Sequence, residues 1–284
     1  MATVLRTWTG VLVVGGALGA GATQCALMPS LDGFSGSQGV PDASPADAAG
    51  EGGGDGGTEG GDSGRWCASL SPAPLFCDDF DDQGPFTRWT DQYVRSGGTV
   101  ARDGTAFRSA PNALLTLSPS SIDPSSAFVY LSTADTKSKV HVAYDMRIDS
   151  RDPTTGYAEV NELRFDTPGL AFAIYLRVFN DPNTSTTVVS EAYLPDGGVP
   201  SHEVALAGNP RFDGWRRVGV DIDLASTPHT VAVTLDGKAA GTVTLEPSLY
   251  APGPVRMQLG IAYTGHPTTS TWAIRYDDVT IDWQ

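Results

Sequence analysis

The sequence predicts an all-β protein: a two-sheet antiparallel β-sandwich that follows a signal peptide and a disordered, glycine-rich linker. Three observations predict this fold class. Apolar and polar residues alternate with a period of two along much of residues 66–284, as expected for strands with one buried and one solvated face. Glycine and proline, 33 and 20 of the 284 residues, separate the alternating segments. No segment after residue 65 has a clear helical period, and the 219 residues there suffice for one large sandwich.

Seven segments carry the alternation most clearly, and we expect each of them to be a strand. In the first, Val140, Val142 and Tyr144 share one face and His141 shares the other with Ala143. Asp-Gly at 236–237 predicts a tight hairpin turn. With shorter segments included, we expect 12 to 14 strands. The seven clear segments are 138–149, 170–179, 216–224, 229–236, 242–245, 255–263 and 272–283.

Composition excludes several other classes of protein. The net charge is −15, and residues after 65 hold 26 acidic and 16 basic side chains, so the acidity belongs mainly to the folded region. Nucleic-acid binding needs clustered Lys and Arg, and only three lysines are present, so we expect no nucleic-acid partner. The shortage of lysine also argues against coiled coils and helical bundles. No internal repeat is visible, which argues against a propeller.

The N-terminal region has the pattern of a targeting signal followed by a flexible tether. Arg6 precedes an apolar run at 11–22 that is too short to span a bilayer but suits a signal peptide, which we place at residues 1–24. In residues 33–64, 12 of 32 residues are glycine, and most of the others are small, polar or acidic. Such a segment cannot bury enough apolar surface to order itself. We therefore expect a disordered acidic tether at 25–65 and a folded domain at 66–284.

The three cysteines divide into a pair and a single residue. Cys67 and Cys77 lie at the entry to the folded region, and a disulfide between them would contribute about 2–3 kcal/mol. Cys25 follows the apolar run, and Ala22-Thr23-Gln24-Cys25 resembles the lipobox of bacterial lipoproteins, in which the cysteine is lipidated. The match departs from the usual pattern in having Ala22 for Leu and Gln24 for Gly or Ala. Ordinary secretion, with cleavage after Ala20 or Ala22, is the alternative.

The folded region resembles the concanavalin A-like lectin/glucanase superfamily, which includes laminin G-like jelly rolls. The resemblance rests on a tryptophan followed by an alternating strand (214–221), a second alternating strand ending in Asp-Gly (231–238) and a short third strand. Phe80, Phe86 and Trp89 resemble the opening element, and residues 276–282 resemble the closing strand. The resemblance implies a jelly-roll sandwich over residues 75–284. It does not fix the function, because lectins, adhesion modules, glycanases and lyases share this fold.

Two kinds of catalytic site are typical of enzymes in this superfamily. Laminarinase-type members carry Glu-x-Asp-x-Glu on one strand, whereas Glu159 and Glu162 are three residues apart and would point to opposite faces of a regular strand unless a bulge aligns them. Alginate lyase-type members carry Arg-x-Glu-Leu-Arg together with Gln-x-His. Glu162-Leu163-Arg164 matches the last three positions, Val160 replaces the first Arg, and the companion motifs are missing. If the protein is an enzyme, we expect its site at Glu159, Glu162, Arg164 and Glu191.

A binding site is the simpler expectation from these side chains. Sugars are held by aromatic rings and by carboxylates, amides or Arg that bond their hydroxyl groups. If the strands concerned share one sheet, Tyr175, Arg177, Glu191 and Tyr193 converge, although the two tyrosines also suit half-buried sheet positions. The residues we expect to bind glycan are Tyr175, Arg177, Glu191, Tyr193, Gln258 and Trp272.

Acidic residues near both ends of the folded region raise the possibility of a metal. Asp79 and Asp81 lie in the first strand region and Asp278 in the last, and sandwich modules of carbohydrate-active proteins often hold structural Ca²⁺ where these strands meet. We expect Asp79, Asp81 and Asp278 as ligands of a structural Ca²⁺, with solvated charge at strand ends as the alternative. The four histidines show no zinc-type spacing.

The sequence therefore predicts an exported, lipid-anchored, monomeric cell-surface protein whose sandwich domain binds glycan. Binding is favoured over catalysis, and the membrane is contacted through the lipid on Cys25. The alternatives are a polysaccharide lyase or glycoside hydrolase on the same fold, a structural module that contacts protein, and a secreted or periplasmic location. The acidity of the domain favours neutral glycans over anionic ones.

Overall fold

Fifteen strands and one short helix make up the computed structural model, which describes residues 66–82, 84–154, 156–167, 169–181, 183–265 and 267–284. The predicted signal peptide, Cys25 and the tether lie outside these residues. Within the described part of the chain, no helix is long and apolar enough to cross a membrane. The elements are α1 (Trp66–Ser69), β1 (Phe76–Asp78), β2 (Asp91–Arg95), β3 (Thr99–Asp103), β4 (Ala113–Ser118), β5 (Ser126–Ser132), β6 (Lys139–Ser150), β7 (Tyr157–Thr167), β8 (Leu170–Phe179), β9 (Thr187–Tyr193), β10 (Ser201–Ala205), β11 (Arg216–Asp223), β12 (His229–Leu235), β13 (Lys238–Leu245), β14 (Val255–Thr264) and β15 (Trp272–Trp283).

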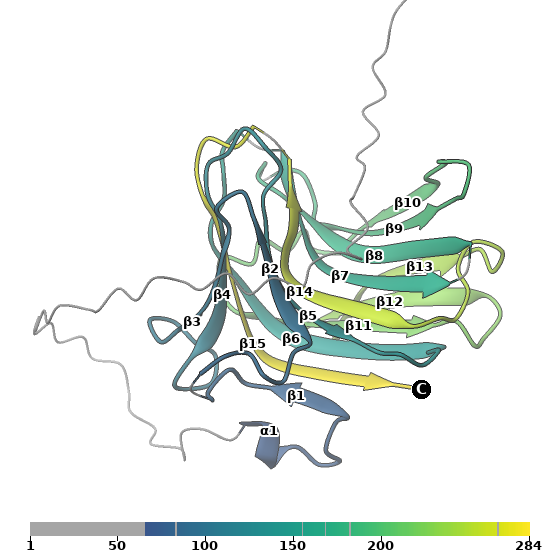
Figure 1. Ribbon diagram of the computed structural model, residues 1–284, viewed down its shortest axis with the longest axis horizontal. Coiled ribbons are helices and arrows are strands. Elements are labelled where there is room, and N and C mark those ends of the chain that lie inside the picture. The colour runs from purple at the N-terminus through teal and green to yellow at the C-terminus, as the bar shows by residue number, and fades with distance from the viewer. Residues whose placement is uncertain (1–65, 83, 155, 168, 182, 266) are drawn as a thin grey trace, which may run out of the picture. The chain divides into compact units, whose positions relative to one another are not determined.

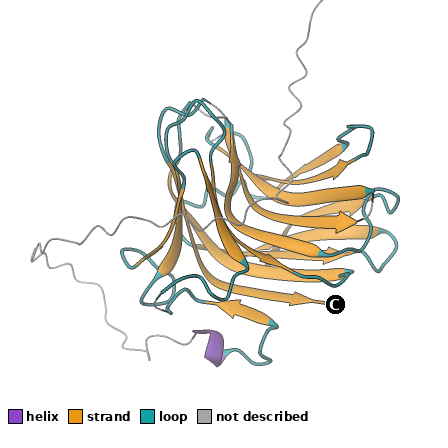
Figure 2. Cartoon of the chain, viewed as in Figure 1, coloured by secondary structure: helices purple, strands orange, loops and turns teal. Residues whose placement is uncertain are grey.

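The strands form two antiparallel sheets stacked as a sandwich (Figures 1 and 2). The eight-stranded sheet has the order β13-β12-β11-β6-β15-β4-β3, with β1 paired to β15. The seven-stranded sheet has the order β10-β9-β8-β7-β14-β5-β2. This confirms the predicted all-β sandwich, and each of the seven clearly alternating segments coincides with a strand within a few residues. Strand β1 lies against the last strand, so the two ends of the domain meet in one sheet.

The alternation predicted the buried face of the strands correctly. Val140, Val142 and Tyr144 of β6 are buried in the core between the sheets, whereas His141 is exposed on the outer face. Between β12 and β13, Asp236 and Gly237 both have positive φ, at 49° and 74°, as the predicted two-residue hairpin requires. The disulfide between Cys67 and Cys77 is also confirmed.

Candidate functional site

A β-bulge in β7 decides which side chains reach the outer face of the seven-stranded sheet. Asn161 has φ 57°, and the pairing of β7 with β8 shifts register between Val160 and Leu163. The amide of Asn161 lies 3.6 Å from the sulfur of Met146 in the core. Because one extra residue is accommodated inward, Glu159 and Glu162 both lie on the outer face, where each bonds an outward side chain. The alignment that a regular strand would forbid is therefore present.

Four of the predicted glycan-binding residues converge on this face. Arg177 of β8 donates hydrogen bonds to Glu159 of β7 and to the hydroxyl of Tyr175, each with a length of 2.9 Å. Tyr175 donates to Glu191 of β9 at 2.8 Å, and Tyr193 donates to the other oxygen of Glu191 at 3.2 Å. The chain of hydrogen bonds thus crosses three neighbouring strands and fixes the positions of two carboxylates and two phenols.

Negative charge exceeds positive charge around Arg177. Besides Glu159, its guanidinium contacts Glu203 of β10 at 3.1 Å and lies 3.9 Å from Glu191, so three carboxylates surround one cation. Burial raises the pKa of Glu159, and the Arg177 contact partly offsets that rise by favouring the ionised form. Burial, together with the charges of Glu159 and Glu191, holds the pKa of Tyr175 far above its usual range, which keeps the phenol protonated.

Glu162 lies next to this chain of hydrogen bonds but has a different partner. The amide of Gln258 in β14 donates to its Oε1 over 2.8 Å, and the side chain is almost completely buried. Burial raises the pKa of Glu162 to about 7, with only a partial opposing contribution from the charge of Arg164. Glu162 therefore keeps its proton to a higher pH than an ordinary glutamate does.

Arg164 completes the set of predicted residues on this face. Its Nε donates to Asp166 at 2.9 Å, and its guanidinium lies over the ring of Tyr193 at 5.5 Å. Arg256, its neighbour on β14, approaches the same aspartate at 3.7 Å. Both arginines are therefore already engaged with a carboxylate at the edge of the site.

One predicted glycan contact is wrong. Trp272 at the start of β15 is completely buried between the sheets. It is in phase with Ile274 and Tyr276, whose side chains also enter the core, so its ring cannot stack on a sugar.

Sequence reasoning missed a group of aromatic rings at the end of the same face. Tyr157 of β7 lies between Phe179 of β8 and Tyr263 of β14, with ring centroids 6.0 and 6.3 Å away. All three rings are half-buried. A second register shift, between Ile261 and Tyr263 in the pairing of β14 with β7, turns Tyr263 outward. The usable signal in the sequence was the period-two spacing of Tyr157 and Glu159.

Gly260 on β14 excludes a side chain from the middle of the sheet. Its φ is 138°, and a Cβ there would lie 2.7 Å from the Cα of Phe128 on β5. The packing of β5 against β14 therefore leaves no room for a side chain at that position.

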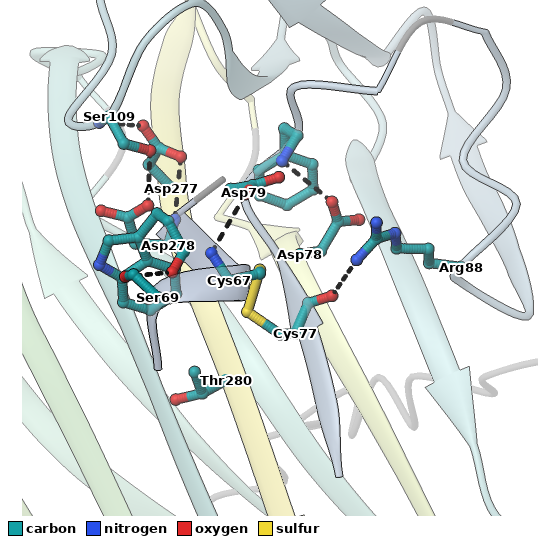
Figure 3. The surroundings of a disulfide bond; sticks show 12 residues. Cys67, Ser69, Cys77, Asp78, Asp79, Arg88, Ser109, Asp277, Asp278 and Thr280 are labelled. Atoms are coloured by element: carbon teal, nitrogen blue, oxygen red, sulfur yellow. Dashed lines mark hydrogen bonds between the residues drawn. A yellow bond between two sulfur atoms is a disulfide. The ribbon is translucent and has the colours of Figure 1, made fainter. Parts of the chain in front are cut away.

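Two of the predicted metal ligands, Asp79 and Asp278, lie close to the disulfide (Figure 3), and their charges act on the third, Asp81. Burial is the main cause that raises the pKa of Asp81 and of Asp278 to about 6, and the charges of Asp79 and Asp278 add to the rise at Asp81. Asp81 also has one buried oxygen without a hydrogen-bond partner.

These carboxylates have other partners, however. Asp79 accepts from the backbone of Cys67, Asp278 from the hydroxyl of Ser109, and Asp81 from the backbone of Asn112. Across the described segments, no group of three or more His, Cys, Asp or Glu side chains is placed to hold a metal ion. As they stand, the residues do not fit a calcium ion, and calcium stays a prediction.

Comparisons with known proteins identify the fold. No family model and no curated protein matches the chain. Among solved structures, it is similar to an endo-β-1,4-glucuronan lyase from the fungus Trichoderma reesei, with 14% identity over 74% of this chain and 96% of that one, and a TM-score of 0.55. The domain shares the two-sheet β-sandwich fold of that lyase.

Two further similar structures have the same sandwich. They are a marine PL-14 alginate lyase from Aplysia kurodai, with 9% identity over 74% of this chain and 99% of that one and a TM-score of 0.51, and a GH16 protein of a Bacteroides ovatus mixed-linkage glucan locus in complex with a G4G4G3G product, with 11% identity over 73% and 99% and a TM-score of 0.50. Two of these three similar structures are thus polysaccharide lyases, and the third is a GH16 protein with a bound glycan product. At such low identity, the similarity concerns the fold alone.

Proposed function

We propose that the outer face of the seven-stranded sheet binds a polysaccharide, and that the protein presents this site outside the cell. The observation that carries the proposal is the chain of hydrogen bonds from Glu159 through Arg177 and Tyr175 to Glu191. It holds carboxylates, phenols and a guanidinium in fixed positions on one face, and these groups are complementary to sugar hydroxyls. The G4G4G3G product bound by the similar GH16 protein is consistent with a glycan ligand.

Affinity electrophoresis in gels that contain soluble polysaccharides tests this proposal. We expect the full chain to be retarded by at least one glycan. Glu191→Ala removes the acceptor of two tyrosine hydroxyls and should weaken that retardation roughly tenfold or more. Asp221→Ala is the matched control, because Asp221 pairs with His141 on the outer face of the other sheet. A wild-type protein that no glycan retards would contradict the proposal.

Hydrolysis of the bound glycan is a second candidate function, favoured by the bulge at Asn161. It places Glu159 and Glu162 on one face. Burial raises the pKa of both, but Arg177 offsets part of the rise at Glu159, whereas the pKa of Glu162 reaches about 7. A retaining glycosidase needs one carboxylate as nucleophile and one carboxylic acid as proton donor. In this scheme Glu162 donates the proton to the leaving oxygen and Glu159 attacks the anomeric carbon.

The release of reducing ends from a bound glycan tests the hydrolase candidate. Glu162→Gln cannot donate a proton in this way and should lower kcat by about 10²-fold or more while leaving retardation in gels in place. The rate should fall as the pH rises above about 7, when Glu162 loses its proton. Retardation without any release of reducing ends would leave binding as the function.

Surface attachment is the remaining part of the proposal, and its support is the sequence around Cys25. We propose that Cys25 carries a lipid and that the tether separates the membrane from the domain. Cys25→Ser should remove the mass that acylation adds to the protein, and it should move the protein from the membrane to the soluble fraction. An unchanged mass and an unchanged distribution would favour ordinary secretion.

A further inference from the structure

The central strands of the two sheets meet at the bulge of β7. β7 is the fourth of the seven strands in its sheet, and β6 is the fourth along the main path of the other sheet. Asn161 of β7 turns inward and is only 2% exposed. Its amide Nδ2 lies 3.6 Å from the sulfur of Met146 on β6, which is completely buried. A polar side chain of one sheet is thus held by a residue of the other sheet in the middle of the core.

Tyr144 of β6 lies close to the same amide. Tyr144 and Met146 are two residues apart, so both side chains enter the core from one face of β6, and both are completely buried. Burial raises the pKa of the Tyr144 hydroxyl, and hydrogen bonding from Asn161 offsets part of that rise. Because an amide in an apolar core is stabilised only by polar or polarisable neighbours, Asn161 depends on these two side chains of β6.

The backbone at Asn161 needs this support. Its φ of 57° lies in the left-handed region, which residues other than glycine adopt at a cost and asparagine tolerates better than most. The register of β7 with β8 shifts around this residue and is regular again from Leu163. Without the contacts of the amide in the core, the extra residue of the bulge could move to another position along β7. The core contacts therefore keep it at position 161.

The position of the bulge fixes the two carboxylates of the site. Glu159 precedes the bulge and accepts a hydrogen bond from Arg177, whereas Glu162 follows it and accepts one from Gln258. If the extra residue moved toward either end of β7, one of these two glutamates would turn toward the core. The outer face thus keeps both carboxylates only while Asn161 stays inward.

We infer that Met146 and Tyr144, two core residues of the eight-stranded sheet, are positioning residues for the glycan site on the outer face of the seven-stranded sheet, and that they act through Asn161. This inference rests on the proposed function and extends the site to residues that a bound glycan cannot touch, because both are completely buried. Their role is to hold Glu159 and Glu162 on the face where the glycan binds.

Substitution of two core methionines provides a matched test in affinity electrophoresis of the full chain. Met146→Leu keeps nearly the same volume and removes the sulfur that contacts Asn161, so it should weaken retardation by the glycan roughly twofold to fivefold. Tyr144→Phe removes only a hydroxyl and should weaken it by a similar factor. Met257→Leu is the control, because Met257 of β14 is also a buried core methionine, and it should leave the retardation unchanged.

Substitutions of Asn161 show whether Met146 acts through it. Asn161→Gly removes the amide but adopts a positive φ readily, so retardation should stay within about threefold of wild type, and Met146→Leu should add no further loss in that background. Asn161→Leu opposes the left-handed backbone and should weaken the retardation tenfold or more. Unfolding temperatures within a few degrees of wild type would show that Met146→Leu and Asn161→Gly are folded.

An NMR titration of the glutamate carboxyls gives a measurement that needs no glycan. Burial raises the pKa of Glu162 to about 7, and the charged groups that act on it are Arg164, Glu159, Arg256 and Glu191. Met146→Leu and Asn161→Leu should both move this titration away from its wild-type position, because the carboxyl changes its surroundings. Met257→Leu should leave it in place.

The outcomes separate this inference from the proposed function. If no glycan retards the wild-type protein, the proposed function is overturned, and the titration of Glu162 decides whether the core residues position this carboxyl. If a glycan retards wild type, Met146→Leu and Asn161→Leu equally, the inference is overturned and glycan binding stands. An equal loss from Met146→Leu with and without Asn161→Gly would also overturn it, because Met146 would then act by another route.

Discussion

Two groups of carboxylates in this domain are held in contrasting ways. On the outer face of the seven-stranded sheet, Glu159 and Glu191 bond side chains from neighbouring strands, namely Arg177 and the tyrosine hydroxyls. Beside the disulfide, Asp277 accepts three backbone N–H groups, from Arg108, Ser109 and Asp278. Side-chain partners can rotate to bond a ligand, whereas backbone amides cannot. The first group is therefore suited to the ligand binding that we propose, and the second to structural support.

Truncation of one carboxylate around Arg177, Glu203, and of one beside the disulfide, Asp277, gives the largest expected difference. Asp277 is completely buried, so Asp277→Ala leaves three amide groups without an acceptor and should lower the free energy of unfolding by about 2–4 kcal/mol. Glu203→Ala, at a side chain that is 37% exposed, should lower it by less than about 1 kcal/mol. Urea unfolding of both variants measures the difference. Equal losses would contradict the division into binding and structural carboxylates.

The pH dependence of stability should be smaller but diagnostic. Burial raises the pKa of Asp277 to about 8, to which the charge of Asp278 also contributes, and raises that of Asp278 to about 6. The folded protein therefore keeps protons that the unfolded chain has lost above pH 4. The stabilisation is complete below the unfolded pKa and is lost as the pH rises through the folded pKa values. The unfolding temperature should thus fall from pH 5 to pH 8.

Glu162 contributes in the same direction, because its pKa is raised to about 7. Variants separate the two regions: Asp277→Asn should remove most of the decline between pH 7 and 8, whereas Glu162→Gln should remove only part of the decline below about pH 7. A pH profile that neither substitution flattens would mean that these carboxyls titrate alike in the folded and unfolded states.

Calcium should produce the smallest effect. Because Asp79, Asp81 and Asp278 have other partners, binding would require them to rotate, and we expect millimolar calcium to raise the unfolding temperature by no more than roughly 2–4 °C. Asp81→Asn should abolish the rise, whereas Asp123→Asn, on an exposed loop, should preserve it. A rise that persists in Asp81→Asn would place the ion elsewhere.

The local alternation of apolar and polar residues predicted the sandwich well, because side chains along a strand with one solvated face point to the core at every second residue. The same rule located the face of Val140, Val142 and Tyr144 in β6. It also brought Tyr175, Arg177 and Glu191 to one surface, since β8 and β9 are regular there.

The rest of the site depends on features that a single segment does not encode. The inward turn at Asn161 is set by its contact with Met146 on the opposite sheet, and the position of Tyr263 depends on a second register shift. Trp272 was wrongly predicted to be exposed, because the sequence around an aromatic residue at the start of a strand does not show whether its side chain faces the core or the solvent. Long-range pairing decides these cases, and it is not visible in residue order.

The bulge at Asn161 also sets which side chains on either side of it in β7 face the core. Residues before it, such as Ala158 and Val160, and residues after it, such as Leu163 and Phe165, are all buried only because one residue is inserted between them. Loss of that residue would exchange inside and outside for one half of the strand, burying charge and exposing rings together. Homologous chains should therefore vary in residue type along β7 far more freely than in length.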